Sequence, residues 1–356
     1  MFNERHYVPI LRWKRGEREA LKQLAEADKE RLTPLIELPP SLFTLDYDAG
    51  DQDLRSMLIR AAGDIQKAWG TRRAFCDLGL MPPRAEAAGA GHPVACLWEY
   101  ARRQRLNLIP VIGLRRSTRY QSAVTRVIYE EGSGACIRLT SEQLYSATFR
   151  NDLASLMVSC NVQPDTVDLV IDRRAVSDIS TPVGELLGRL PTVTAWRTLT
   201  VAGGSFPRDL SGFRVGQHVH PRLEWRLWRN EVLDAERVKR RATFADYTTQ
   251  HAVFVEPPRR ANFSASIRYT STDNWVVMRG EGVFNDDSAG FAQWPANAAL
   301  LCERPEFCGE RFSAGDSYIA SRAVFGASTG NAESWLRAGV NHHMTFVARQ
   351  IASLTD

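Results

Sequence analysis

Residues 106–139, LNLIPVIGLRRSTRYQSAVTRVIYEEGSGACIRL, carry the pattern that decides the fold. Residues 106–114 and 135–139 are largely apolar runs, and residues 118–130 between them place apolar side chains at helical spacing. A strand, a helix and a second strand in this order predict two parallel strands joined by a right-handed crossover. A continuous apolar run is typical of a parallel strand that is buried on both faces.

The same alternation extends in both directions along the chain. Before this stretch we expect strands at 7–13, 32–38 and 74–80 and helices at 16–30, 51–69 and 93–104. After it we expect helices at 141–160, 181–189 and 221–239 and strands at 166–172, 195–202 and 243–247. Eight such units predict an α/β fold, a (β/α)8 TIM-like barrel. An open doubly wound sheet is the alternative, although residues 13–16, Trp-Lys-Arg-Gly, lack the glycine-rich dinucleotide fingerprint.

Residues 252–326 interrupt this rhythm. Residues 266–270 and 275–279 alternate apolar and polar side chains around a polar turn, which predicts an antiparallel hairpin. A final helix is expected at 331–354, with apolar residues on one face. We therefore expect a barrel formed by residues 1–251 and 327–356, with residues 252–326 as an insertion that contains a β-hairpin.

Composition restricts the class of protein. The 356 residues include 45 basic and 41 acidic side chains, a net charge of +4, which gives no clear signal for nucleic-acid binding. The six cysteines form no CxxC pair, as is usual for reduced thiols in a cytosolic protein. The first residues lack the apolar segment of a secretory signal, and no apolar stretch approaches the roughly 20 residues of a membrane span. We expect a soluble, cytoplasmic protein without a membrane partner.

Charged residues recur at or near the C-terminal ends of the predicted strands. They are Lys14, Glu37, Asp77, Arg115, Arg138, Asp172 and Asp246, and the seventh strand ends instead in Gly203-Gly204-Ser205. In a parallel barrel these ends and the loops after them meet at one mouth, where active sites lie. A charge in an apolar strand is costly unless it is paired or bound to a ligand. The residues therefore form either a ligand pocket or a structural ring of ion pairs.

The residue types suggest the chemistry of such a pocket. Carboxylates at Glu37, Asp77, Asp172 and Asp246 are ligands of the kind that Mg²⁺ prefers, so a metal-assisted hydrolase is one enzyme class that fits. Cations at Lys14, Arg115 and Arg138 suit an anion. Gly203 and Gly204 form either a phosphate-binding turn or a plain tight turn. Together they favour a polar or phosphorylated small molecule, or a nucleotide, as the ligand.

Other barrel reactions fit less well. Many barrel glycosidases use carboxylates at the ends of strands four and seven. The corresponding ends here carry Arg115 and Gly203-Gly204. A pyridoxal phosphate enzyme, with Lys14 as the imine lysine and the glycine turn on the phosphate, remains a loose alternative.

Two adjacent histidines on the last helix are further candidates. His342 and His343 point about 100° apart on a helix, so they cannot form the usual metal pair with i, i+4 spacing. Each is either a catalytic residue or a packed, hydrogen-bonded core histidine. Residues 313–316, Ser-Ala-Gly-Asp, form a predicted turn in which Asp316 can orient one of these rings.

Segments at both ends of the chain carry a resemblance. YVPILRWKRGE at 7–17 and LTPLIELPP at 32–40 resemble the phage "beta protein" family, as do FSAGD at 312–316, WLRAG at 335–339 and NHH at 341–343. The family is functionally uncharacterised, so the resemblance implies no reaction. It draws attention to Lys14, Glu37, Asp316, His342 and His343. Members occur in bacteria and phages, often near mobile elements, which implies a role in phage–host conflict by analogy.

Two functions follow as hypotheses. The first is a protein that binds or processes a polar anionic small molecule or nucleotide at the barrel mouth. The second is a non-catalytic interaction module of a multi-protein defence assembly that contacts a protein partner through residues 252–326. Its candidate anchors are Phe254, Phe263, Tyr269, Trp275, Phe284, Phe291 and Trp294, which otherwise fill the core of the insertion.

Overall fold

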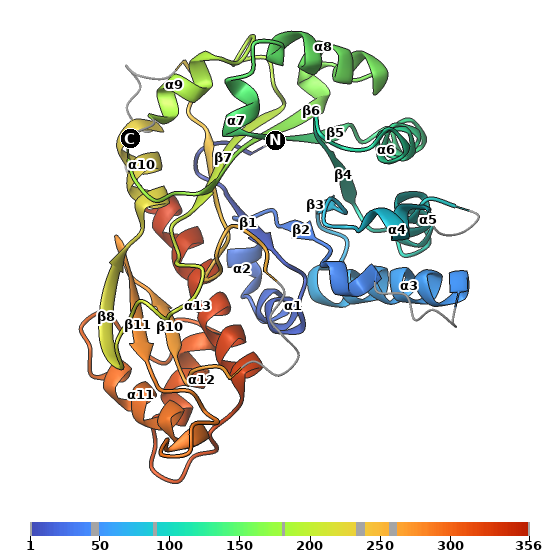
Figure 1. The fold of residues 1–356 in the computed structure, drawn as a ribbon. Coiled ribbons are helices and arrows are strands. Elements are labelled where there is room, and N and C mark those ends of the chain that lie inside the picture. Colours follow the sequence, from blue (N-terminus) through green and yellow to red (C-terminus); the bar gives the residue numbers. More distant parts are fainter. Residues whose placement is uncertain are drawn as a thin grey trace.

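A computed structural model describes residues 2–43, 50–87, 91–179, 182–232, 239–255 and 262–354. Its central feature is a closed barrel of parallel strands in chain order, in which the first strand pairs with both the second and the last (Figure 1). The strands are β1 (Tyr7–Leu11), β2 (Leu35–Glu37), β3 (Ala74–Asp77), β4 (Leu108–Ile112), β5 (Ala135–Thr140), β6 (Val167–Ala175), β7 (Thr198–Gly204) and β9 (Thr243–Asp246). The predicted TIM-like barrel is confirmed, and the open sheet is excluded.

Helices connect these strands and cover the barrel. They are α1 (Arg15–Lys22), α2 (Glu26–Lys29), α3 (Gly50–Trp69), α4 (Pro83–Ala87), α5 (Pro93–Arg103), α6 (Thr118–Glu131), α7 (Ser141–Leu144), α8 (Phe149–Ser159), α9 (Val183–Gly188), α10 (Leu223–Val232) and α13 (Ala332–Ala352), with 3₁₀ turns η1 (Pro40–Phe43) and η2 (Pro164–Thr166). Two of the predicted helices are broken into pairs. The helix expected at 141–160 divides into α7 and α8 because Ser146 accepts a bond from the Thr148 amide at 3.4 Å, a local bond that competes with the helix. The helix expected at 16–30 divides into α1 and α2.

The barrel interior is filled in three layers. The middle layer is apolar and includes Val8, Phe75, Val111 and Val170. Because strand side chains alternate, residues two positions further along each strand lie in the layers above and below. At the N-terminal end, buried Asp168 pairs with Arg73 and with Arg197, the latter at 2.7 Å. The layer at the C-terminal end is the polar one described below, so the barrel is a packed core and not a pore.

A second, antiparallel sheet lies beside the barrel. It consists of β10 (Ile267–Thr270), β11 (Asn274–Arg279) and β8 (Gly216–Pro221), in the order β10-β11-β8. The predicted hairpin is confirmed, with Thr270 opposite Trp275. However, β8 precedes α10, so this sheet also draws on a segment outside 252–326. Two helices and a 3₁₀ turn that were not predicted pack here: α11 (Gln293–Cys302), α12 (Ala314–Arg322) and η3 (Gly290–Ala292).

Helix α13 joins the two units (Figure 1). It packs against α1 and β1 of the barrel on one side and against β10 and α12 on the other. Its N-terminus is capped by Asn331, whose side chain accepts a bond from the Ser334 amide at 3.0 Å. Among the described helices, none combines the length and the apolar character that crossing a membrane would require.

Candidate functional site

The polar layer at the C-terminal end of the barrel is organised around Arg138 on β5. Its guanidinium donates to Glu37 at 2.5 Å, to Asp77 at 3.0 Å and to Asp172 at 2.7 Å. It also donates to the Tyr247 hydroxyl at 2.8 Å. All of these side chains are buried. Four of the predicted mouth residues are thus brought together as a closed network of ion pairs.

Further cations complete the network. Arg12 at the end of β1 pairs with Glu37, and Arg116 donates to both oxygens of Asp77 at 2.8 and 2.9 Å. Arg174 lies 3.1 Å from Asp172. Each buried carboxylate therefore faces two arginines, which offsets the cost of removing its charge from water.

The pKa values follow from this geometry. Burial alone would raise the pKa of Asp77, but the charges of Arg116 and Arg138 hold it below its usual value. The same opposition, with Arg138 and Arg174 as the cations, lowers the pKa of Asp172. Burial alone would lower the pKa of Arg138, whereas its anionic and phenolic neighbours raise it well above its usual value. Asp77 and Asp172 are therefore negatively charged and Arg138 is positively charged near neutral pH.

The strand-end aspartates also hold the backbone. Asp77 accepts a bond from the Gly79 amide at 2.7 Å, and Asp172 accepts one from the Arg174 amide at 2.9 Å. Both bonds reach two residues ahead, as in an Asx turn. Arg174 has a positive φ of 59°, a left-handed conformation that this bond helps to hold. The recurrence of Asp at strand ends thus has a local structural cause.

The predicted magnesium site does not fit this arrangement. Glu37, Asp77 and Asp172 surround the Arg138 guanidinium, which supplies the positive charge that a cation would bring. In the described part of the chain, no three His, Cys, Asp or Glu side chains are grouped so that they could hold a metal ion. We therefore derive no chemical step through a metal.

Asp246 lies in a different cluster, outside the barrel wall. It accepts a bond from the Tyr7 hydroxyl at 2.5 Å and lies 2.9 Å from Nε2 of His343 on α13. The other ring nitrogen of His343 is 2.8 Å from the Thr270 hydroxyl. Since β9 residues alternate in direction, Tyr247 points into the barrel and Asp246 points away from it.

His342 belongs to a third buried cluster. Its Nδ1 lies 2.8 Å from Asp316, which confirms the predicted contact between Asp316 and a histidine. Its Nε2 is 2.9 Å from the Thr270 carbonyl, and its ring stacks on Tyr269 at 3.7 Å. Both histidines are fully buried with both ring nitrogens bonded. This is the geometry of packed core histidines, and a catalytic role for either stays a prediction.

The remaining predicted residues lie at the edge of the mouth. Arg115 is exposed and lines a separate cleft of about 410 Å³ beside α6, α7 and α8. Gly203 and Gly204 continue β7 into the barrel wall, where a Cβ on Gly203 would lie 2.9 Å from the Val176 side chain. The amide of Ser205 is already bonded to Glu224 at 2.9 Å, so this turn does not present that N–H to an anion.

Lys14 lies in a cleft that adjoins the mouth. Its ammonium is 5.0 Å from the Phe254 ring centre. Two neighbouring cavities form this cleft, and both are lined by Arg208, Gln250, Arg268 and Leu336. The smaller cavity reaches Arg12, Lys14 and Glu17, and the larger one, of about 710 Å³, lies between the barrel and the second sheet. We call the two cavities together the cationic cleft.

Arg268 on β10 stands where the two cavities meet. Its guanidinium donates to the Thr249 carbonyl at 2.8 Å and lies 4.8 Å from the Phe206 ring centre. No carboxylate of the described residues forms an ion pair with it, and burial lowers the pKa of Arg268 to about 10. Arg279, which also lines the larger cavity, donates to two carbonyl oxygens of the described residues, at 3.1 Å to Leu210 and 2.6 Å to Gly280, and lies within the electrostatic influence of Asp209.

Comparison with known families agrees with the sequence motifs. The family model described as Beta protein matches residues 7–349. The chain belongs to the Beta protein family. No curated protein matches the sequence. Membership covers nearly the whole length, so the barrel, the second sheet and the cleft between them all lie within the family's domain.

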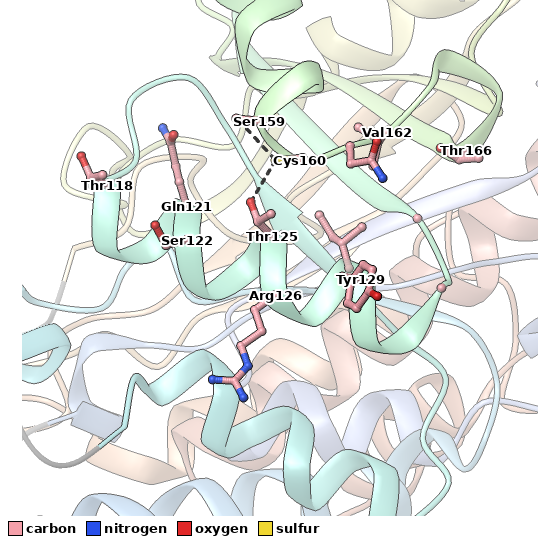
Figure 2. Close-up of a pocket in the computed structure, with 14 residues that line it drawn as sticks. Thr118, Gln121, Ser122, Thr125, Arg126, Tyr129, Ser159, Cys160, Val162 and Thr166 are labelled. Carbon is pink, nitrogen blue, oxygen red and sulfur yellow. Dashed lines mark hydrogen bonds between the residues drawn. The ribbon is translucent and has the colours of Figure 1, made fainter.

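This Beta protein family member also has a groove on its outer surface. It measures about 730 Å³ and lies between α6 and the C-terminal end of α8 (Figure 2). Thr125 donates to the Cys160 sulfur at 3.5 Å across the groove, and Tyr129 at its edge is 85% exposed. The groove carries one arginine, Arg126, which already pairs with Glu130 at 2.8 Å. It therefore lacks the uncompensated charge of the cationic cleft.

Several residues of the network and the cleft were missed from the sequence. Arg12 and Tyr247 could have been found, because alternation places them on the same strand faces as Ile10 and Ala245 in the barrel interior. Arg116, and not Arg115, reaches the mouth, and no local pattern distinguishes the two. Arg208 and Arg268 come from segments that only the tertiary fold brings together.

Proposed function

We propose that the protein binds a small polar molecule through its anionic group in the cationic cleft. The observation that carries this proposal is Arg268, a partly buried guanidinium without a carboxylate partner among the described residues. An unpaired, desolvated cation is costly, and an anionic ligand would offset that cost. Lys14 and Arg208 line the same cleft and add to its positive potential.

The cleft fits this role better than the barrel interior does. The donors of Arg138 are directed at Glu37, Asp77, Asp172 and Tyr247, and all of these side chains are buried. A ligand entering that layer would have to break ion pairs. The network serves instead as a rigid floor that positions Arg12 and the end of β1 beside the cleft.

One acidic group of the cleft is suited to a phosphate. Burial raises the pKa of Glu17, and its Oε1 is buried without a hydrogen-bond partner in the described structure. A raised pKa favours the neutral carboxyl group, which would reduce the repulsion between Glu17 and a phosphate oxygen. Arginine binds phosphate and carboxylate groups alike with two parallel bonds, so Arg268 suits a ligand with either kind of anion. The proposed setting is phage–host conflict, as the family resemblance implies.

Binding of inorganic pyrophosphate tests the proposal. We expect isothermal titration calorimetry to detect binding to the wild-type protein and at least about a tenfold loss with Arg268→Gln, the effect of removing one charge-assisted contact. Arg103→Gln is the matched control, because Arg103 is an exposed arginine on α5, far from the cleft, and pairs with Glu99 at 2.6 Å. Equal affinity in wild type and Arg268→Gln, or no binding by the wild type, would refute the proposal.

A second candidate function is the interaction module. Among its predicted anchors, Tyr269, Trp275 and Trp294 are buried core residues, whereas Phe284 is 62% exposed. Phe325, which follows α12 in the sequence, is fully exposed, at 104%. Exposed aromatic side chains favour a protein contact. The test is a pull-down from phage-infected cells with the tagged wild type and with a tagged double variant, Phe284→Ser with Phe325→Ser. We expect the double variant to lose any partner that the wild type retains and to keep its affinity for pyrophosphate. Retention of the partner by the double variant would refute this candidate.

A further inference from the structure

A buried pair of opposite charges, Arg222 and Glu224, lies at the corner where β8 ends and α10 begins. Nη1 of Arg222 donates to the Ser271 and Thr272 carbonyls in the turn between β10 and β11, at 3.1 and 3.2 Å. The same nitrogen donates to Oε1 of Gln350 on α13 at 3.0 Å. Arg222 therefore ties this corner to the second sheet and to α13.

Glu224 ties the same corner to the barrel. Its Oε2 accepts a bond from the amide of Ser205, the residue that directly follows β7, at 2.9 Å. The Ser205 hydroxyl in turn donates to the Pro221 carbonyl at 3.1 Å. The pair thus forms part of the joint between the barrel and the second sheet.

The sides of the two groups that face each other are without partners. Nε and Nη2 of Arg222 and Oε1 of Glu224 are buried and accept or donate no hydrogen bond among the described residues. The indole N–H groups of Trp225 and Trp275 also lack partners, and the centres of their rings lie 5.2 and 5.5 Å from the guanidinium carbon. Buried polar groups are nearly always bonded, and an unbonded buried charge is costly.

The spacing of the pair fits a bridging water molecule. Nε of Arg222 is 3.9 Å from Oε1 of Glu224, which is too far for a direct hydrogen bond. A water about 2.8–2.9 Å from both atoms spans this distance, because it accepts from the guanidinium and donates to the carboxylate. An anion would accept from Arg222 in the same way, but an ionised Glu224 would repel it.

We propose that Arg222 and Glu224 hold an ordered water molecule between them, and that this hydrated pair makes the joint between the barrel and the second sheet respond to pH. The site is separate from the proposed anion site. Neither residue lines either cavity of the cationic cleft.

The charged groups around the pair come from both units. Asp246 on β9, Tyr7 on β1 and Asp273 in the β10–β11 turn act electrostatically on the guanidinium, and Asp246 also acts on the carboxyl group. His343 on α13 lies 2.9 Å from Asp246 and is itself influenced by the guanidinium. Asp246 therefore adds a second negative charge to the buried surroundings, which disfavours the ionised form of the carboxyl group.

The direction of the pH response follows from these surroundings. Burial raises the pKa of Glu224 to about 7; the charge of Arg222 opposes this rise and that of Asp246 adds to it. The folded protein therefore holds this proton more tightly than the unfolded chain, in which the pKa is about 4.3. The stability that comes from the neutral carboxyl group is fully present below that unfolded value and is lost as the pH rises through about 7.

A crystal structure of the wild type grown in bromide tests the water. We expect a water molecule within about 3.2 Å of an Arg222 guanidinium nitrogen and of Oε1 of Glu224. A direct hydrogen bond between the two side chains, or a bromide ion in the place of the water, would overturn the proposed site. Bromide is the probe because its anomalous scattering distinguishes a bound halide from water.

Urea denaturation at pH 5 and pH 8 tests the response to pH. Glu224→Gln keeps the shape of the side chain but cannot ionise. We expect the ratio of the unfolding equilibrium constants, wild type over Glu224→Gln, to be at least about tenfold larger at pH 8 than at pH 5, since one pKa unit corresponds to a tenfold change.

Glu303→Gln is the matched control, because Glu303 is exposed and follows the last residue of α11. Its ratio to the wild type should be the same at both pH values. An equal ratio at pH 5 and pH 8 for Glu224→Gln would overturn the proposed pH response. Neither experiment measures pyrophosphate binding, so failure here leaves the proposed anion site intact.

Discussion

At the scale of single residues, the strand-end charges separate into groups with different surroundings. Glu37, Asp77, Arg138 and Asp172 meet in one buried network, whereas Asp246 points out of the barrel toward His343. Inside the barrel, arginine side chains lie between the carboxylates. The positive and negative charges of the network therefore largely neutralise each other.

Replacing Arg138 tests how much the fold depends on this network. Arg138→Met would leave Glu37, Asp77 and Asp172 buried without their shared cation, so we expect the free energy of unfolding to fall by about 3–5 kcal/mol. Urea denaturation at pH 8 would measure it, with Arg103→Met as the control. A loss below about 1 kcal/mol would show that the carboxylates do not need Arg138.

The pH dependence of the wild type has a defined sign. The folded-state pKa values of Asp77 and Asp172 lie below their ordinary values. The stability that they contribute is therefore fully present above the unfolded pKa of about 3.9 and is lost as the pH falls through the folded values. In Arg138→Met each of these carboxylates would keep only one arginine, so burial would move its pKa upward from the wild-type value. We expect the destabilisation by this substitution to shrink between pH 8 and pH 5 in urea titrations; a constant difference would contradict the assignment.

At the scale of elements, the strand–helix rhythm predicted the barrel because parallel buried strands leave a strong apolar signal. The same signal could not predict β8, an edge strand whose residues are all exposed or partly exposed and which, among the described strands, pairs only with β11. Its polar sequence has no buried face to reveal it. Strand alternation could have predicted that Asp246 points away from the network. It could not have predicted the partner of Asp246, His343, which lies on α13, 97 residues further along the chain. Contacts of that kind depend on the tertiary fold alone.

Helix α13 carries the two histidines that unite the barrel with the second sheet. His343→Ala would leave Asp246 buried without its ring partner, and His342→Ala would do the same to Asp316. We expect each to lower the free energy of unfolding by about 2–4 kcal/mol in urea titrations. Asn331→Ala, which removes the N-terminal cap of α13, should lower the free energy of unfolding by about 1 kcal/mol and serves as the reference for the two histidine variants.

The same variants separate structure from catalysis. Neither histidine lines either cavity of the cationic cleft. We therefore expect pyrophosphate affinity to stay at the wild-type value for both histidine variants at temperatures where they are folded. Wild-type stability together with lost binding or activity would instead support the catalytic role predicted from the sequence.

At the scale of the whole molecule, ion pairs fill the mouth of the barrel. The candidate site lies instead at the boundary between the barrel and the second sheet. The cleft takes Lys14 from the end of β1, Arg208 from the segment after β7 and Arg268 from β10. Because α13 packs against both units, we expect barrel and insertion to unfold in one cooperative transition. Calorimetry should give a single peak whose calorimetric and van't Hoff enthalpies agree; two separate peaks would contradict this coupling.

We propose that this protein binds its ligand in the cationic cleft and not inside the barrel. The most direct measurement is a crystal structure of the wild-type protein with pyrophosphate. We expect the anion within hydrogen-bonding distance of the Arg268 guanidinium, with the bonds between Arg138 and Glu37, Asp77 and Asp172 unchanged. An anion bound to Arg138 inside an opened mouth, with Arg268 unoccupied, would contradict it.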